Sequence, residues 1–237
     1  MYDKYLPELG SAAQLDAMDA CDIVFVAVPT PFDAALGACD VVNVIDVAER
    51  VSAPLCIKST VPPGTIEDLA KLTGKRIAYS PEYLGESPDH PWREADACGF
   101  VVLAGDELAC EIVKTAYESS STARLRYVRS GVREAELAKY MENCFLATKV
   151  AFANQFHELA RKAGVDYDDV RAIFTLDPRA GASHTAVTNE RGFGGKCLPK
   201  DLRSLIAWAG GPHAAPLLQH VAEYNDAIRQ GRDARVG

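Results

Sequence analysis

The chain contains the apolar run Ile23-Val24-Phe25-Val26-Ala27-Val28, which ends abruptly at Pro29-Thr30-Pro31. Further apolar runs lie at residues 55–60, 76–79 and 100–103, and helix-like segments alternate with them at residues 41–51 and 107–119. Short strands that are apolar on both faces and alternate with helices are typical of a parallel sheet covered by helices on both sides. The pattern therefore predicts an α/β fold in the first half of the chain.

Polar residues and prolines follow three of these runs, at the point where each strand would end. The clusters are Pro29-Thr30-Pro31, Ser59-Thr60 and Ser80-Pro81-Glu82. In parallel sheets, ligands bind beyond the carboxyl ends of the strands. Any one cluster is also what an ordinary turn after a strand looks like. Three at the same end of neighbouring strands favour a shared binding rim.

The second half of the chain has the pattern of helices. Residues 133–163 include no glycine or proline, their apolar residues recur at helical spacing, and Gly164 supplies a stop signal. A helix of roughly 30 residues is about 45 Å long, which is too long for one face of a small domain. We expect it to join the sheet domain to a helical region and to carry a homodimer interface. Shorter helices are expected at residues 166–174, 199–209 and 216–229.

Charge and composition limit the classes of partner. A formal net charge of −8 argues against general binding to nucleic acid or to an anionic membrane. No apolar stretch approaches the roughly 20 residues that span a bilayer, and the start Met1-Tyr2-Asp3-Lys4 has no signal-peptide pattern. Seven scattered cysteines without a C-x-x-C pair indicate reduced thiols, so a cytoplasmic protein is expected. The histidine spacings predict no protein-bound metal.

The nonapeptide Phe193-Gly194-Gly195-Lys196-Cys197-Leu198-Pro199-Lys200-Asp201 carries the strongest chemical signal. Glycines allow backbone and ligand to come close, and proline suits the first helical position. A cysteine at a helix start lies beside unpaired N–H groups, which favour its thiolate. The alternative is a buried cysteine beside a glycine turn, but the added Pro-Lys-Asp favours a nucleophile for covalent catalysis.

Other candidate residues are weaker signals by themselves. Lys139 and Asn143 are four apart on the long helix and could donate hydrogen bonds to an oxyanion, although the same spacing is common on solvated faces. Glu82 and Glu86 could supply a general base or simply begin a helix. Arg179 could bind a substrate phosphate or be an ordinary turn cation.

Together these stretches resemble the UDP-glucose/GDP-mannose dehydrogenase family. The nonapeptide resembles the family signature, and the other motifs occur in the same order as in the family. They are Val28–Pro31, Lys58–Thr65, Ser80–Glu86 and Lys139-x-x-x-Asn143, and the resemblance runs from about Tyr2 to about Arg229.

The resemblance implies oxidation of the C6 hydroxymethyl group of a nucleotide sugar to a carboxylate, with two NAD and a covalent Cys197 intermediate. UDP-glucose is the leading substrate. GDP-mannose, an N-acetylated UDP-sugar, or a non-catalytic remnant that binds a sugar nucleotide or dimerises are the alternatives. The implied catalytic residues are Cys197, Lys139, Asn143, Asp201, Glu86 and Thr60. The implied cofactor-binding residues are Asp3, Lys4, Pro29, Thr30, Thr60, Glu86 and Lys200. The implied substrate-binding residues are Glu82, Tyr83, Leu84, Gly85, Glu86, Lys139, Asn143, Arg179, Phe193, Gly194, Gly195 and Cys197.

Against the family pattern, the sequence begins near the end of the second strand, where Asp3 stands, and has no G-x-G-x-x-G turn. We therefore expect an incomplete Rossmann-like parallel sheet, then the long connecting helix and a small all-helical domain, without the family's C-terminal nucleotide-binding domain. The predicted division is residues 1–130 for the NAD-binding domain, 131–230 for the long helix and central domain, and 231–237 for a tail.

Overall fold

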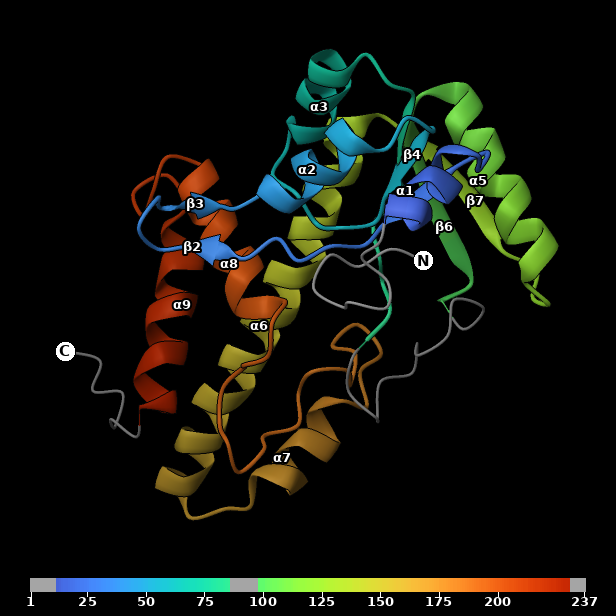
Figure 1. Cartoon of the computed structure of the whole chain (residues 1–237). Coiled ribbons are helices and arrows are strands. Elements are labelled where there is room, and N and C mark those ends of the chain that lie inside the picture. Colours follow the sequence, from blue (N-terminus) through green and yellow to red (C-terminus); the bar gives the residue numbers. More distant parts are fainter. Residues whose placement is uncertain (1–11, 86–97, 231–237) are drawn as a thin grey trace. The chain divides into compact units, whose positions relative to one another are not determined.

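The computed structural model describes residues 12–85 and 98–230 of the chain (Figure 1). It divides into two compact units, which are described separately. The first comprises Met1–Pro31 and Cys39–Lys139, and the second comprises Phe32–Ala38 and Tyr140–Gly237. The division falls inside the long helix. Residues 32–38, which lie in the predicted sheet domain, belong to the second unit.

The first unit is built on a five-stranded sheet of order β1-β4-β5-β6-β7. These strands are β1 (Val24–Val26), β4 (Leu55–Ile57), β5 (Ile77–Tyr79), β6 (Phe100–Gly105) and β7 (Arg126–Ser130). The pairs β1/β4, β4/β5 and β6/β7 are parallel, with Leu55 opposite both Val24 and Ile77. The predicted parallel α/β sheet is thus confirmed for these pairs, whereas β5 and β6 run antiparallel.

A glycine allows the close approach of β6 to β5 in their antiparallel pair. Gly105, at the end of β6, has a φ of +99°, and a Cβ there would lie 2.4 Å from the carbonyl oxygen of Ile77. A side chain is therefore excluded by both backbone conformation and space. Asp106 then donates its backbone N–H to Ile77 and accepts from the N–H of Ala109, which caps the following helix.

Helices cover both faces of the sheet, as predicted (Figure 1). In its described part, the first unit has the helices α1 (Ala12–Asp19), α2 (Val42–Arg50), α3 (Thr65–Thr73) and α5 (Glu107–Ser120), and the start of the long helix α6 (Val132–Ala163) up to Lys139. Leu55 and Ile57 join the core beneath α2 and α3, while the intervening Cys56 joins the core beneath α5. This alternation explains the uniformly apolar strands, because each face of the sheet has its own hydrophobic core.

Some elements escaped the sequence prediction. They are α1, α3, β7 and the short pair β2 (Phe32–Asp33) and β3 (Ala38–Cys39). The edge strand β7 has no fully buried residue and carries Arg126 and Arg129, so it lacks the apolar run that marks the other strands of this sheet.

In its described residues, the second unit has helices and loops apart from β2 and Ala38 of β3. Its helices are the rest of α6 (Val132–Ala163), then α7 (Tyr167–Phe174), α8 (Leu198–Trp208) and α9 (Pro216–Arg229), as the sequence predicts within a residue or two. Ala147 and Val150 of α6 pack with Leu202 of α8 and Val221 of α9. Gly164 ends α6 in the left-handed conformation (φ +72°), and Asp166 caps α7.

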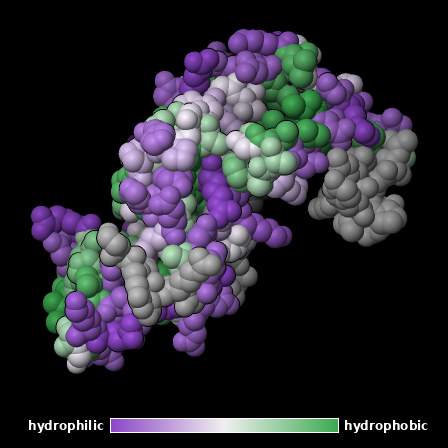
Figure 2. All heavy atoms as spheres, turned by 90° about the vertical axis from the view of Figure 1, so that its left-hand side faces the viewer, coloured by the Kyte–Doolittle hydropathy of each residue, from purple (hydrophilic) through white to green (hydrophobic). Residues whose placement is uncertain are grey.

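The surface is mixed in character. On the face drawn in Figure 2, hydrophilic residues alternate with smaller hydrophobic areas. Within residues 12–85 and 98–230, no helix is long and apolar enough to cross a bilayer.

A buried carboxylate joins α6 to the loop after β4. Glu136 is fully buried and accepts hydrogen bonds from the backbone N–H groups of Gly64 (2.6 Å) and Ile66 (2.9 Å), at the start of α3. Burial raises the pKa of Glu136 to about 6, and the two hydrogen bonds oppose this only in part.

This pKa predicts a measurable pH dependence. A carboxyl whose pKa is raised by folding stabilises the folded state below about pH 4.5, and this stabilisation is lost as the pH rises through about 6. The free energy of unfolding of the wild type, relative to Glu136→Gln, should therefore fall by about 2 kcal/mol between pH 4 and 7. Urea unfolding of both proteins across this range measures the difference. A difference that does not change with pH would contradict the assignment.

Candidate functional site

The strand ends that the sequence analysis assigned to a binding rim lie together in the first unit. The loops after β1 and β4 are tied together, because the Ser59 hydroxyl accepts from the Val28 N–H (2.9 Å) and donates to the Val28 carbonyl (2.7 Å). The Thr30 hydroxyl donates to the Thr60 carbonyl at 2.8 Å. Thr30 and Ser59 are both buried. The structure thus brings Pro29, Thr30 and Thr60 to one edge of the sheet.

A lysine that the sequence analysis did not select extends this rim. Lys58 directly follows β4, and its ammonium lies 3.4 Å from the Glu82 carboxylate and donates to the Tyr117 hydroxyl at 3.0 Å. Burial lowers the pKa of Lys58, but the nearby Glu82 and Tyr117 outweigh this, so the pKa lies above its usual value. A lysine ending an otherwise apolar strand was the available signal.

The loop after β5 is held from several sides. The other Glu82 oxygen accepts from the backbone N–H groups of Tyr83 (2.8 Å) and Leu84 (2.9 Å). The ring of Tyr83 lies 4.9 Å from that of Phe100 and faces the Lys139 ammonium at 4.4 Å. Lys139 is therefore buried against an aromatic face, where a cation–π interaction contributes to its placement.

In the second unit, Cys197 immediately precedes α8, as the sequence predicts. Its carbonyl accepts the backbone N–H of Asp201 at 2.9 Å, which is the first bond of the helix, and Pro199 occupies the first turn. Cys197 is exposed. Cys197 thus occupies the N-cap position of α8, where its side chain makes no capping hydrogen bond but the positive end of the helix dipole favours a thiolate.

Asp201 is the buried polar centre beside this helix start. One of its oxygens accepts from the side-chain amide of Asn143 on α6, and the other lies 2.6 Å from the Lys200 ammonium. Asp201 and Asn143 are only 1% and 5% exposed, so both are paired groups in a low-dielectric setting. Asn143 follows Lys139 by about one turn of α6, as the sequence predicts.

The structure adds little support for the other residues that the sequence analysis selected. Arg179 is exposed and forms an ion pair with Asp177 in its own loop (2.6 Å), which holds the pKa of that carboxyl below its usual range. The predicted residues Asp3, Lys4 and Glu86 lie outside the described residues. No group of three or more potential metal ligands occurs in the described ranges.

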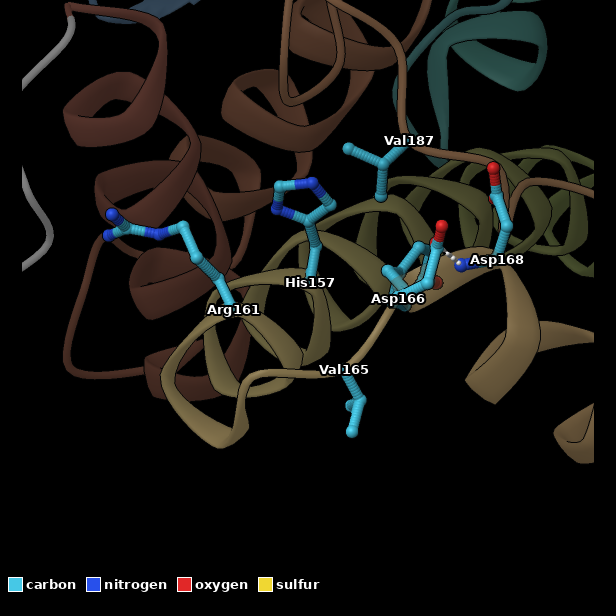
Figure 3. Close-up of a pocket in the computed structure, with 7 residues that line it drawn as sticks. His157, Arg161, Val165, Asp166, Asp168 and Val187 are labelled. Carbon is cyan, nitrogen blue, oxygen red and sulfur yellow. Dashed lines mark hydrogen bonds between the residues drawn. The ribbon is translucent and has the colours of Figure 1, made fainter.

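A cavity of about 300 Å³ lies elsewhere in the second unit, where α6 meets α7 (Figure 3). Among its lining residues, the His157 ring points toward Val187, and Asp166 is hydrogen-bonded to the backbone of Asp168. None of the site residues predicted from the sequence is among those that line it within the described chain.

Comparison with known proteins identifies the chain. Residues 8–95 match the NAD-binding domain of the UDP-glucose/GDP-mannose dehydrogenase family, and residues 133–227 match the central domain of the same family. The chain belongs to this family. The matches cover the rim at the strand ends and the Cys197 region respectively, which confirms the resemblance seen in the sequence motifs.

Individual relatives agree. UDP-glucose 6-dehydrogenase of Pseudomonas aeruginosa PAO1 is 35% identical over 214 residues, which are 83% of this chain and 46% of that protein. A UDP-glucose dehydrogenase structure from Pyrobaculum islandicum has a TM-score of 0.76 at 28% identity, covering 93% of this chain and 53% of that one. A UDP-D-ManNAc dehydrogenase from Pyrococcus horikoshii has a TM-score of 0.75 at 26% identity, covering 90% and 52%. The chain spans about half the length of these relatives.

The family match gives NAD as the cofactor. The residues present fit it, because dinucleotides bind beyond the carboxyl ends of parallel strands. The ends of β1 and β4 lie side by side there and carry the buried hydroxyls of Thr30 and Ser59.

The environments of the cysteines predict which of them react. Burial raises the pKa of Cys56 and of Cys144 to about 12, with Asp201 adding to the effect at Cys144, and it also raises that of Cys110. At pH 8 a thiol with a pKa of 12 is only about one part in ten thousand thiolate. Among the seven cysteines, which all lie in the described residues, only Cys21 and Cys197 are exposed.

Iodoacetamide at pH 8 should therefore label Cys21 and Cys197 in the folded chain. Labelling of Cys56, Cys110 and Cys144 should be at least tenfold slower until urea unfolds the protein. Peptide mass spectrometry of timed samples measures each site. Rapid labelling of Cys144 without denaturant would contradict the burial.

Proposed function

We propose that the chain is a nucleotide-sugar 6-dehydrogenase, with UDP-glucose as substrate and UDP-glucuronate as product. The observation that carries the proposal is the exposed Cys197 thiol at the start of α8, in a helix whose buried Asp201 is bound by Asn143 and Lys200. Exposure and a helix start favour a nucleophile, whereas the buried thiols of Cys56 and Cys144 suit packing.

NAD, when bound, would supply the hydride acceptor for the two successive oxidations at C6 of the sugar. Of the residues in the described part, Pro29, Thr30, Thr60 and Lys200 are those that would hold it, together with Asp3, Lys4 and Glu86 outside that part. Family resemblance and the placement of Thr30 and Thr60 at one sheet edge support this assignment.

Cys197 acts between the two oxidations. Its sulfur adds to the C6 aldehyde to give a thiohemiacetal, which becomes a thioester once the second hydride has left. Water then adds to the thioester carbon, and the carboxylate and the free thiol are released. The sum is one alcohol, two NAD⁺ and one water converted to one carboxylate, two NADH and three protons.

The polar residues are assigned to the charges that develop in these steps. Lys139 and Asn143 donate to the oxyanion formed when sulfur or water adds to the carbonyl carbon. Asp201, with Glu86 and Thr60, orients and deprotonates the water. Glu82 to Glu86, Arg179 and Phe193 to Gly195 bind the sugar nucleotide.

Cys197 variants test the covalent step. Chain incubated with NAD and UDP-glucose should produce NADH, measured at 340 nm, and Cys197→Ala should lower the rate at least a thousandfold, since no thioester can form. Cys197→Ser should stall as an oxygen ester that mass spectrometry detects. Cys21→Ala, which removes the other exposed thiol, is the matched control and should keep the full rate.

The same assay separates the alternatives. A higher kcat/KM with GDP-mannose or an N-acetylated UDP-sugar would replace UDP-glucose as the substrate. Full activity of Cys197→Ser would exclude the covalent role. Absence of NADH with every sugar, with NAD showing no heat of binding in calorimetry, would leave the non-catalytic alternative.

We further propose that the chain forms a homodimer through α6. Five large apolar residues on the part of this helix in the second unit are 41–73% exposed, namely Met141, Phe145, Phe152, Phe156 and Leu159. Three of them, Phe145, Phe152 and Leu159, recur every seven residues, which is the spacing by which one helix packs along another. An exposed apolar stripe on so long a helix supports a second copy of the same helix as its partner.

A charge in this stripe should separate the subunits. Phe152→Asp should convert a dimer to a monomer in sedimentation velocity, because it places a carboxylate among the rings of Phe156 (4.6 Å) and Phe174 (6.3 Å). Leu217→Asp, at a more exposed apolar position on α9, should leave the mass unchanged. A monomeric wild type at micromolar concentration would contradict the proposal.

A further inference from the structure

The loop that leads to Cys197 has an unusual backbone. Arg191 and Gly192 are successive residues in the left-handed region, with φ of +57° and +62°, and Gly195 follows at +75°. A residue other than glycine at such a φ carries strain, which surrounding contacts must offset. Two buried asparagines on different helices supply these contacts.

Asn154, on α6, holds the first part of the loop. Its side-chain oxygen accepts from the Arg191 guanidinium (2.8 Å) and from the Gly192 N–H (3.2 Å), while its amide nitrogen donates to the Val150 carbonyl (2.9 Å). The Arg191 guanidinium also pairs with Glu158 at 2.6 Å and lowers the pKa of that carboxyl. Asn154 is 1% exposed, so its bonds are made away from water.

Asn225, on α9, holds the next residue at two points. Its side-chain oxygen accepts the Phe193 N–H at 2.7 Å, and its amide nitrogen donates to the Phe193 carbonyl at 3.1 Å. Asn225 and Phe193 are both buried, and the Phe193 ring packs in the core with Leu202 of α8. A Cβ on Gly192 would lie 2.4 Å from the Asn225 oxygen, so the glycine is required for this approach.

We propose that Asn225 and Asn154 are positioning residues for Cys197. They fix the backbone of Arg191-Gly192-Phe193, and only Gly194, Gly195 and Lys196 separate this anchor from the thiol at the start of α8. Glycines have few conformational restraints of their own. The anchor on one side and α8 on the other therefore determine where the thiol lies relative to the helix N–H groups.

The role of Cys197 as nucleophile rests on the proposed function. The effect of Asn225 and Asn154 on the reactivity of its thiol does not. Alkylation of Cys197 needs neither NAD nor sugar, so it measures the effect of the two asparagines even in a chain that produces no NADH. A failure of the dehydrogenase assay and a failure of this proposal are thus separate results.

The test compares two asparagine-to-aspartate changes in the same unit. In Asn225→Asp a carboxylate oxygen replaces the amide nitrogen and opposes the Phe193 carbonyl, so one bond becomes a repulsion. Asn189→Asp makes the same chemical change at an exposed position two residues before Arg191. Iodoacetamide labelling of Cys197 is followed from pH 6 to 9 by peptide mass spectrometry, with Cys21 of the first unit as the internal reference.

With Asn225→Asp we expect Cys197 labelling at pH 7.5 to fall at least threefold and its pH profile to move to higher pH, because a loop that is no longer fixed at Phe193 does not hold the thiol at the positive end of α8. Cys21 labelling and the helical circular dichroism should not change, and Asn189→Asp should match the wild type. An unchanged Cys197 rate and profile in folded Asn225→Asp would overturn the proposal, as would an equal change in Asn189→Asp.

A second variant decides the case if Asn225→Asp does not fold. Arg191→Gly relieves the left-handed backbone strain and removes the guanidinium bonds to Asn154 and Glu158, so the chain should fold with a looser loop. Cys197 labelling should then fall about twofold in the same pH direction. Labelling equal to that of the wild type would overturn the proposal.

Discussion

The first unit depends on one buried carboxylate, that of Glu136 on α6. It accepts the two backbone N–H groups at the start of α3, which no helical carbonyl could reach. A buried charge is costly unless it is hydrogen-bonded, so these bonds fix the loop after β4 against α6. Thr60 lies in this loop and Lys139 lies one turn further along α6. The placement of both site residues within this unit therefore follows from a residue that is itself remote from the chemistry.

The second unit also has a buried, hydrogen-bonded carboxylate that links another segment to α6, that of Asp201. Asp201 is almost fully buried in α8, and Asn143 of α6 and Lys200 bind its two oxygens. The start of α8, and with it Cys197, is thereby attached to α6. The carboxylate is kept in place by a neutral donor and a cation, which compensate its lost hydration. The residues that bind it are also those assigned to oxyanions and to the cofactor, so structure and proposed chemistry draw on the same groups.

The sequence predicted those features that depend on local pattern. The apolar runs of β1, β4 and β5 and the long glycine-free helix were recognisable because periodicity and burial are written into consecutive residues. The apolar run of β6 was recognisable as well, but its antiparallel direction was not, since this depends on Gly105 passing the Ile77 carbonyl. The helix start at Cys197 was predicted, but the Lys58–Glu82 pair and the Asn225–Phe193 bonds were not. Their partners are far apart in sequence, and only the fold brings them together.

The lysines of the candidate site bear on how a chain of net charge −8 would bind the anionic substrate proposed for it. Lys58 is paired with Glu82, Lys139 faces the ring of Tyr83, and Lys200 is paired with Asp201. Each cation is thus held in one place by a partner of its own unit. Long-range attraction for phosphate is weak in such an arrangement, which disfavours nucleic acid. The proposed function therefore assigns recognition to short-range donors at fixed positions, which suit a small ligand whose phosphates and hydroxyls match them.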